Sequence, residues 1–241
     1  MRKDIVDNIK CCDSYDNEDR PVIDFFCGLN SSLHYNYIEI GSGLCRFPKK
    51  IKDIFHNFDI SCFEINEKSA LIAETNGFKT IIGNVLKNDI KSESYDIVHC
   101  SHIIEHFKYP DVIKFVDEML RITKCGGYLI IRSPLMWEHF YDDIDHIRPY
   151  PPEAILNYLY NPQQQSVGHN NVRVEKIWYR TRPKHFLYMN DLSPFHSLKL
   201  IRGCYNRWIH FWNKRMHNWW NKYRWPATPP NGYVMIMKKE S

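Results

Sequence analysis

Two acidic residues and a glycine-rich turn combine the residue types that bind a nucleoside. The segment Glu39–Gly43 reads Glu-Ile-Gly-Ser-Gly, and its glycines allow a tight turn whose backbone N–H groups approach a ligand closely. Glu64 follows 23 residues after Gly41 and ends the next apolar run. At such a strand end, a carboxylate accepts hydrogen bonds from both hydroxyls of a ribose. Together these residues predict a site for a ribose-containing cofactor.

A second set of candidate residues is the run from Asp145 to Arg148, which contains His146. An imidazole accepts a proton near neutral pH. The neighbouring carboxylate of Asp145 is expected to orient and polarise the imidazole of His146. His106 is the second candidate base. Clustered carboxylates such as Asp142, Asp143 and Asp145 also bind divalent cations. Polar residues in a surface loop are more often simply solvated, so a divalent cation held by these carboxylates and His146 stays an alternative that the sequence does not favour.

Short apolar runs predict the strands that must position these residues. Stretches with helical spacing fill the gaps, as in 68–75 and in 110–122, where apolar residues recur three to four apart. This alternation predicts an α/β fold, a mostly parallel sheet with helices on both faces. Loops at the carboxyl ends of parallel strands meet in one crevice, which brings the candidate residues together. The predicted strands are 37–40, 60–63, 80–82, 95–100, 128–131, 172–179 and 233–237.

The order of these motifs resembles the class I S-adenosylmethionine-dependent methyltransferases over roughly residues 35–180. The segments that carry the resemblance are Glu39–Gly43, Glu64, Gly83-Asn84, Ser101–His106 and Leu120–Ile131. The resemblance implies a Rossmann-like fold with a seven-stranded sheet, and S-adenosylmethionine as the cofactor. It assigns cofactor binding to Glu39, Gly41, Ser42, Gly43, Glu64, Ile65, Asn84, Val85, Ser101, His102 and His106.

Three residues depart from the family's pattern. Cys45 replaces its third glycine, Asn84 its usual aspartate and Cys125 its usual proline. Asn84 can still accept a hydrogen bond from the adenine amino group through its side-chain oxygen, while Cys45 is expected to reduce cofactor affinity. A nicotinamide-dependent dehydrogenase shares the acid at position 64. It is disfavoured because the third glycine is missing and because Glu39 precedes the turn, as the methyltransferase pattern requires.

The segment 145–150 reads Asp-His-Ile-Arg-Pro-Tyr and resembles methyltransferases of surface polysaccharide and O-antigen assembly. That resemblance implies O-methylation of a sugar hydroxyl in a glycan or glycan precursor. His146 is expected to act as the base with Asp145, while Arg148 and Trp137 shape the acceptor site. Two alternatives stay open. One is a methyltransferase for a small molecule or a lipid, and the other is a non-catalytic binding module that keeps the fold.

Charge and tryptophan are unevenly distributed along the chain. Residues 1–172 hold 18 Lys/Arg and 25 Asp/Glu, whereas residues 173–241 hold 14 and 3, with six of the seven tryptophans. We expect a leader over 1–35 and a methyltransferase domain over 36–241, with residues 180–232 as a basic aromatic insertion before the last strand. Aromatic residues recur every three or four positions over 205–223, which predicts a helix.

The insertion has three interpretations. In the first, the helix packs on the domain and its charges are solvated. In the second, the insertion forms an aromatic platform for the acceptor, and in the third it makes peripheral contact with a membrane through 205–225. Nucleic acid is not the expected partner, because the chain shows no base-reading module.

The cellular location is predicted from segments that the chain lacks. No apolar run reaches about 18 residues, and the charged N-terminus, Met1–Asp7, has no apolar core typical of an export signal. The eight cysteines contain no CxxC pair, so we expect reduced thiols without a zinc site. These observations predict a cytoplasmic protein that makes at most peripheral contact with a membrane.

Overall fold

The computed structural model describes residues 18–160, 171–189, 198–223, 225 and 228–240, together with the backbone of 9–12. It divides into two units, Met1–Arg180 with Asn231–Ser241, and Thr181–Pro230. Each unit is described by itself. Met1–Asp7, on which the expected absence of an export signal rests, and Arg224 of the expected membrane contact lie outside the described residues.

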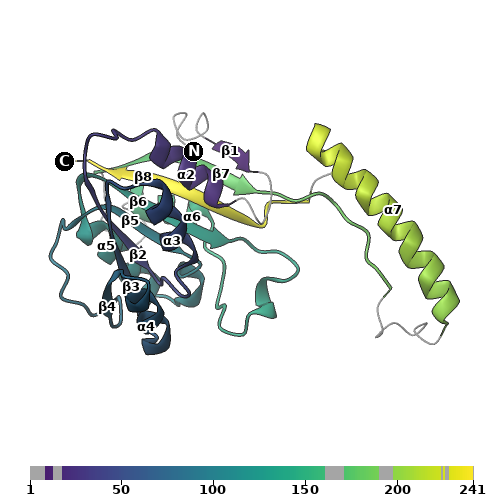
Figure 1. Cartoon of the computed structure of the whole chain (residues 1–241), viewed down its shortest axis with the longest axis horizontal. Coiled ribbons are helices and arrows are strands. Elements are labelled where there is room, and N and C mark those ends of the chain that lie inside the picture. Colours follow the sequence, from purple (N-terminus) through teal and green to yellow (C-terminus); the bar gives the residue numbers. More distant parts are fainter. Residues whose placement is uncertain are drawn as a thin grey trace. The chain divides into compact units, whose positions relative to one another are not determined.

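The first unit is built on an eight-stranded sheet in the order β1-β7-β8-β6-β5-β2-β3-β4 (Figure 1). Neighbouring strands are parallel except at β8, which runs antiparallel to both β6 and β7. The seven predicted strands are confirmed, and the eighth is β1, which the sequence did not predict. The bounds are β1 Ile9–Cys12, β2 Tyr35–Ile40, β3 Phe58–Glu64, β4 Lys79–Ile82, β5 Tyr95–Ser101, β6 Thr123–Pro134, β7 Val172–Arg180 and β8 Gly232–Lys239.

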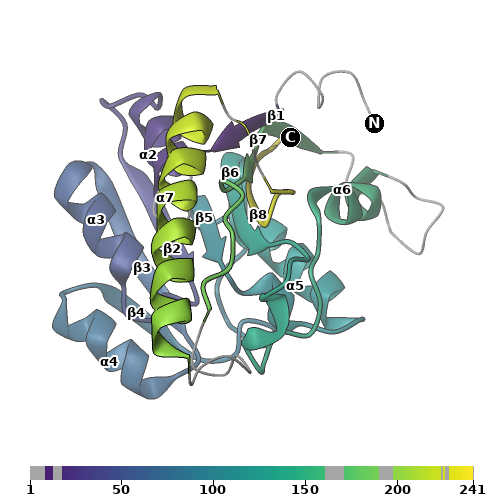
Figure 2. The ribbon, with the colours of Figure 1, turned by 90° about the vertical axis from the view of Figure 1, so that its right-hand side faces the viewer.

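Helices cover both faces of this sheet (Figure 2). On one face lie α2 (Asp19–Cys27), α3 (Arg46–Ile54) and α4 (Glu67–Thr75), and on the other lie α5 (Asp111–Ile122) and α6 (Pro152–Tyr160). Apolar residues at helical spacing pack against alternate residues of the strands, because successive side chains of a strand point to opposite faces. Two short 3₁₀ helices, Ile104–His106 after β5 and Phe140–Asp142 after β6, complete the unit.

The core has one large cluster on each face of the sheet and a third, smaller one around Cys62. On the α5 face, Phe115 and Met119 pack with Ile131, and on the α2 face, Phe26 packs with Tyr37. Since β2, β3, β4, β5 and β6 are parallel, their carboxyl ends lie at one edge. The predicted site residues follow these ends.

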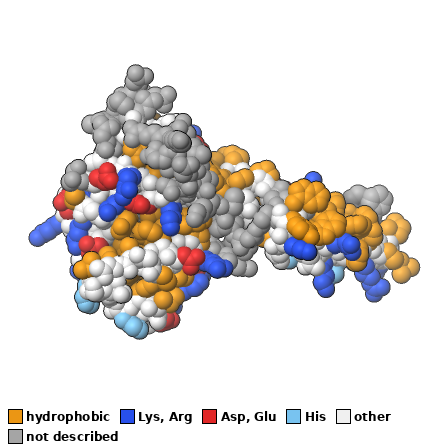
Figure 3. Space-filling view, turned by 90° about the horizontal axis from the view of Figure 1, so that it is seen from above, with side chains coloured by type: hydrophobic (Ala, Val, Ile, Leu, Met, Phe, Trp, Pro, Cys, Tyr) orange, Lys and Arg blue, Asp and Glu red, His pale blue; other side chains and the backbone are white. Residues whose placement is uncertain are grey.

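The second unit contains a 25-residue helix, α7 (Lys199–Tyr223), and the extended segment 181–189. The side chain of Asn213 accepts a hydrogen bond from the backbone N–H of Phe186 at 2.6 Å and donates one to its carbonyl at 2.9 Å. The side chain of Asn206 likewise accepts from the backbone N–H of Met189 at 2.8 Å and donates to its carbonyl at 2.9 Å. Basic and hydrophobic side chains line the surface of this unit side by side (Figure 3). Among the described residues, no helix is both long and apolar enough to cross a membrane.

Candidate active site

The turn after β2 supplies backbone groups to the site. Gly41 and Gly43 adopt φ angles of +68° and +50°, in the left-handed region that favours glycine. A Cβ atom on Gly41 would lie 2.1 Å from Cδ1 of Ile103, whereas one on Gly43 would meet nothing within 4 Å. Glycine at 41 is therefore required for packing, and the space around Gly43 is open to a ligand.

Cys45 stands where the family's pattern has its third glycine. It also has a left-handed φ, of +56°, and immediately precedes α3. Its side chain is buried in a cluster with Cys62, Ala73 and Phe78. The thiol therefore fills space in the protein interior.

The carboxylate of Glu64 is held at the end of β3 by backbone N–H groups. It accepts hydrogen bonds from Gly43 at 2.8 Å, from Ile65 at 3.0 Å and from Asn66 at 3.1 Å. The apolar side chain of Ile65 is 68% exposed beside it. A fixed carboxylate with a remaining lone pair next to an exposed apolar surface fits the ribose and the adenine of a nucleoside.

The ends of β4 and β5 carry the next predicted residues. Asn84 accepts a hydrogen bond from the backbone N–H of Leu86 at 2.9 Å, through the side-chain oxygen expected to contact adenine. Val85 is buried, and Ser101 ends β5 opposite Arg132. The adenine contact of Asn84 stays a prediction, and it would use the second lone pair of this oxygen.

Glu39 lies behind the glycine turn in the protein interior. Its carboxylate accepts a hydrogen bond from the hydroxyl of Tyr37 and lies 2.7 Å from Nδ1 of His99. Burial and the adjacent Glu39 carboxylate raise the pKa of Tyr37 well above its usual range, so Tyr37 stays a donor. The described contacts of Glu39 thus connect β2 to β5 directly before the glycine turn.

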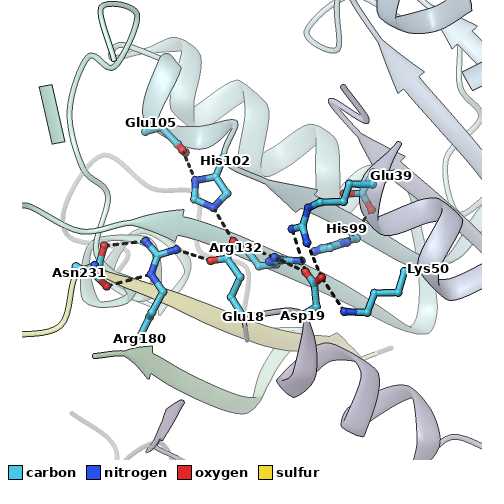
Figure 4. Close-up of polar contacts among 11 residues, drawn as sticks. Glu18, Asp19, Glu39, Lys50, His99, His102, Glu105, Arg132, Arg180 and Asn231 are labelled. Carbon is cyan, nitrogen blue, oxygen red and sulfur yellow. Dashed lines mark hydrogen bonds and ion pairs between the residues drawn. The ribbon is translucent and has the colours of Figure 1, made fainter. Parts of the chain in front are cut away.

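A network of buried charges, which the sequence did not predict, connects α2 to the ends of β6 and β7 (Figure 4). Nη2 of Arg132, a residue only 1% exposed, donates to Asp19 at 2.8 Å and lies 3.1 Å from Glu18. Nη1 of Arg180 donates to the other oxygen of Glu18 at 2.5 Å. Neither Glu18 nor Asp19 belongs to a recognisable motif, because the leader shows only scattered acids. The one sequence feature that could have indicated the network is Arg132, a charged residue directly after an apolar run.

His102 extends this network toward the end of β5. Its ring lies between the carboxylates of Glu18, at 3.3 Å, and Glu105, at 3.4 Å. Burial disfavours the charged ring, but the contacts with the two carboxylates outweigh it and raise the pKa of His102 to about 9. His102 was predicted to bind the cofactor. The structure places its side chain in an ion-pair network beside the glycine turn.

A hollow of about 580 Å³ opens at the same edge of the sheet. Its lining includes four imidazoles, those of His102, His106, His139 and His146, together with Trp137 and Arg180. His102 directly precedes Ile103, which packs on Gly41, so the hollow adjoins the glycine turn. A larger hollow of about 920 Å³ along β3 and β4 contains none of the predicted site residues.

His146 is oriented by a backbone carbonyl. Its Nδ1 lies 2.7 Å from the carbonyl oxygen of Phe140, and its Nε2 lies 3.7 Å from Asp143. A carbonyl oxygen only accepts, so Nδ1 carries the proton and Nε2 of the neutral ring keeps its lone pair. Asp145, which was expected to orient His146, instead lies against His106, whose Nδ1 is 3.1 Å from the Asp145 carbonyl oxygen and 3.5 Å from its carboxylate.

The remaining predicted residues lie around the same loop. The rings of His106 and His146 are 5.1 Å apart, so the structure brings both candidate bases together. The side chain of Arg148 is exposed and lies over the ring of Tyr150, while its backbone N–H donates to the carbonyl of Glu105. Arg148 therefore fixes the loop through its backbone.

Comparison with known proteins agrees with this geometry. Residues 38–131 match the model of a methyltransferase domain. No curated protein matches the sequence. Solved structures share the fold, among them an S-adenosylmethionine-dependent methyltransferase from Archaeoglobus fulgidus, with 20% identity, 91% of this chain and 90% of that chain covered and a TM-score of 0.59.

Two further structures show the same likeness. A possible histamine N-methyltransferase from Thermotoga maritima is 18% identical, with 95% and 90% of the two chains covered and a TM-score of 0.53. An S-adenosylmethionine-dependent methyltransferase from Methanosarcina mazei is 13% identical, with 91% and 97% covered and a TM-score of 0.54. At these identities the likeness establishes the fold.

Proposed function

We propose that this chain, which carries an S-adenosylmethionine-dependent methyltransferase domain, methylates a sugar hydroxyl of a glycan or glycan precursor. The observation that carries the proposal is the lining of the hollow beside the glycine turn, where the imidazoles of His106, His139 and His146 lie with the indole of Trp137. A sugar offers several hydroxyls that such polar groups bond, and an apolar ring face that stacks on an indole.

Cofactor binding is assigned to the strand ends around the turn. The backbone at Gly41 and Gly43 approaches the ligand, Glu64 accepts from the ribose hydroxyls, and Ile65 and Asn84 contact the adenine. When bound, S-adenosylmethionine supplies a methyl group on a positively charged sulfur, which leaves as a neutral thioether. Ser42, Val85, Ser101 and His102 complete the assigned set, with Glu39 directly before the turn.

Removal of the acceptor proton is assigned to His146. The lone pair on Nε2 is available in this hollow, because Nδ1 is committed to the carbonyl of Phe140. Nε2 of His146 would take the proton of the acceptor hydroxyl when the methyl group is transferred to its oxygen. Trp137 and Arg148 are assigned to the acceptor, and Asp145 with His106 forms the neighbouring wall.

Calorimetric titration with S-adenosylmethionine tests the first half of the proposal. We expect micromolar binding that Glu64→Ala abolishes and that Glu67→Ala, an exposed acid at the start of α4, retains. The second half is tested with nucleotide sugars and oligosaccharides as acceptors, by mass spectrometry for the gain of one methylene. Methylation of small amines or thiols but of no sugar would overturn the acceptor assignment. Absence of cofactor binding would favour a binding module.

A lipid-linked acceptor is the second candidate, and α7 favours it. Trp208, Phe211 and Leu200 of this helix are 56%, 55% and 86% exposed. The basic residues Arg207 and Lys214 are exposed too, and no acidic residue occurs in the described range 198–223. Exposed aromatic and basic side chains on one helix suit the interface of a membrane with anionic lipids. We therefore propose peripheral contact of α7 with such a membrane.

Sedimentation with phospholipid vesicles tests this contact. We expect binding to vesicles that contain phosphatidylglycerol, little binding to phosphatidylcholine alone, and weakening by salt. Lys214→Glu should reduce affinity roughly fivefold or more, since each basic residue near the surface contributes about 1 kcal/mol. Lys79→Glu, an exposed lysine of the first unit, is the matched control. Equal binding to neutral vesicles, or preferential binding to nucleic acid at the same salt, contradicts the proposal.

A further inference from the structure

His106 and His146, which line the hollow, form a cluster with the buried carboxylate of Glu105, although these residues come from two different loop segments, after β5 and after β6. One nitrogen of each ring and one carboxylate oxygen of Glu105 all lie within 4.8 Å of one another. The loops are held together by the backbone N–H of Ile147, which donates to the carbonyl of Glu105 at 2.9 Å. Two imidazoles and one carboxylate are a donor set for divalent transition metals.

Both rings present the tautomer that a metal ligand needs. Nδ1 of His146 donates to the carbonyl of Phe140 at 2.7 Å, and Nδ1 of His106 donates to the carbonyl of Asp145 at 3.1 Å. In each neutral ring the lone pair is therefore on Nε2. Metal-binding histidines characteristically donate their other N–H to a carbonyl or carboxylate, which fixes the ring and its basicity.

The carboxylate of Glu105 is the third member of the cluster and comes from the protein interior. The residue is fully buried, and its Oε2 accepts from the hydroxyl of Ser133 at 3.2 Å. Its Oε1 is buried too and makes no hydrogen bond with any described group. Nδ1 of His102 forms an ion pair with this oxygen at 3.4 Å, and Nε2 of His146 lies 3.9 Å from it on the side of the cluster. A carboxylate oxygen has two lone pairs, so the contact with His102 leaves one through which Oε1 could bind a cation.

We propose that Glu105, His106 and His146 bind a divalent first-row transition-metal cation, such as Mn²⁺, Co²⁺ or Zn²⁺, in the hollow. Small shifts of the side chains bring the three donors to metal-ligand distances of about 2.0–2.2 Å. Three protein ligands leave further coordination positions open, and the surrounding hollow gives an acceptor access to them. Nitrogen donors favour these cations over Mg²⁺, which prefers oxygen.

The role of this cation rests on the proposed function. A sugar hydroxyl bound to a divalent cation loses its proton more readily, so the metal would lower the pKa of the acceptor. The Nε2 lone pair of His146 binds either the metal or the proton of the acceptor. Where the cation is bound, His146 is a ligand, and the acceptor proton passes to solvent. Chelation therefore distinguishes the two roles of His146.

The test measures metal binding on the full chain, without methyl transfer. Protein freed of metal with a chelator is titrated with MnCl₂ by calorimetry and with CoCl₂ by visible absorption. We expect one tight site, with ligand-field bands of bound cobalt and a higher thermal midpoint in the presence of Mn²⁺. Glu105→Gln, His106→Ala and His146→Ala should each weaken binding by at least about 100-fold. His139→Ala removes an imidazole from the same lining and should retain the affinity.

The outcomes separate this inference from the proposed function. Absence of binding to the wild-type chain, or equal affinity in the His106→Ala, His146→Ala and His139→Ala variants, overturns the metal site. Circular dichroism identifies any variant that fails to fold, and Glu105→Gln preserves the volume at the buried position. Methyl transfer that is undiminished by chelator overturns the metal's role and leaves His146 as the base. Failure to methylate any sugar leaves the binding result intact.

Discussion

The guanidinium of Arg132 donates to the carboxylate of Asp19 across 2.8 Å, although 113 residues separate them in the sequence. Both side chains are 1% exposed. Arg46 and Lys50 of α3 bond to the other side of the same carboxylate, at 2.7 and 3.2 Å. These contacts connect the start of α2 to the carboxyl end of β6, beside the candidate site.

Removing Arg132 should destabilise the fold strongly. Arg132→Met leaves a buried carboxylate without its buried partner, and loss of one member of such a pair costs about 3–5 kcal/mol. Arg46→Met is the matched control, because Arg46 contacts the same carboxylate but is 66% exposed. We expect it to cost no more than about 1 kcal/mol. Urea unfolding of the wild type, Arg132→Met and Arg46→Met measures the two losses of unfolding free energy. Equal losses in the two variants would contradict a larger contribution from the buried contact.

The same carboxylate predicts a pH dependence of stability. Burial opposes the charge on Asp19, but Arg132 and Arg46 outweigh it and lower its pKa below the usual value. A lowered folded pKa contributes stability that is fully present above the unfolded value of about 3.9 and is lost as the pH falls through the folded value. The difference in unfolding free energy between wild type and Asp19→Asn should therefore be constant from about pH 7 to 5 and shrink below about pH 4. A difference that grows in acid contradicts this assignment.

Gly41→Ala should weaken cofactor binding through a steric clash. The new Cβ would overlap Cδ1 of Ile103 in a left-handed conformation, so the turn must shift. We expect at least about tenfold lower affinity for S-adenosylmethionine, equivalent to about 1.4 kcal/mol. Adding Ile103→Ala removes the clash and should restore part of the affinity. Gly126→Ala has the same backbone strain with open space around it, and should lower stability without changing affinity.

His146 and Asp145 should differ sharply in their effect on turnover. His146→Ala removes the group assigned to the proton and should lower kcat by about 10²–10⁴-fold. Asp145→Asn should lower it less than about threefold, because this exposed side chain lies against His106 and the ring of His146 is fixed by a carbonyl. The comparison uses saturating acceptor and cofactor. Equal losses in the two variants would return Asp145 to the role of orienting partner.

The sheet could be predicted because its signal is local. Each strand is a run of apolar residues, as in 128–131, and the glycine turn and Glu64 mark two strand ends by residue type alone. The buried charges could not be predicted in the same way. Glu18 and Asp19 acquire their role from Arg132 and Arg180, and no local pattern identifies a partner over a hundred residues away. The short β1 was missed for a related reason, since it pairs with the distant β7.

The candidate site shows the same limit on a smaller scale. Proximity in sequence suggested that the carboxylate of Asp145 orients His146. Instead, the rings of His106 and His146 each donate a hydrogen bond to a main-chain carbonyl. Carbonyl groups occur at every residue, so residue type carries no information about such a contact. His106 and His146 could be named as candidates from residue type. Their position beside Glu105 required the structure.

The segment Thr181–Pro230 is flanked by Arg180 and Asn231, which are hydrogen-bonded to each other. The backbone N–H of Asn231 donates to the carbonyl of Arg180 at 2.9 Å, and Nε of Arg180 donates to the side chain of Asn231 at 3.0 Å. With its ends joined by β7 and β8, the segment contributes loop-closure entropy that changes only slowly with its length. Such a segment can therefore be shortened, lengthened or exchanged at little cost to the folding of the first unit. The strands that carry the candidate site are thus insulated from changes in the length and sequence of this segment.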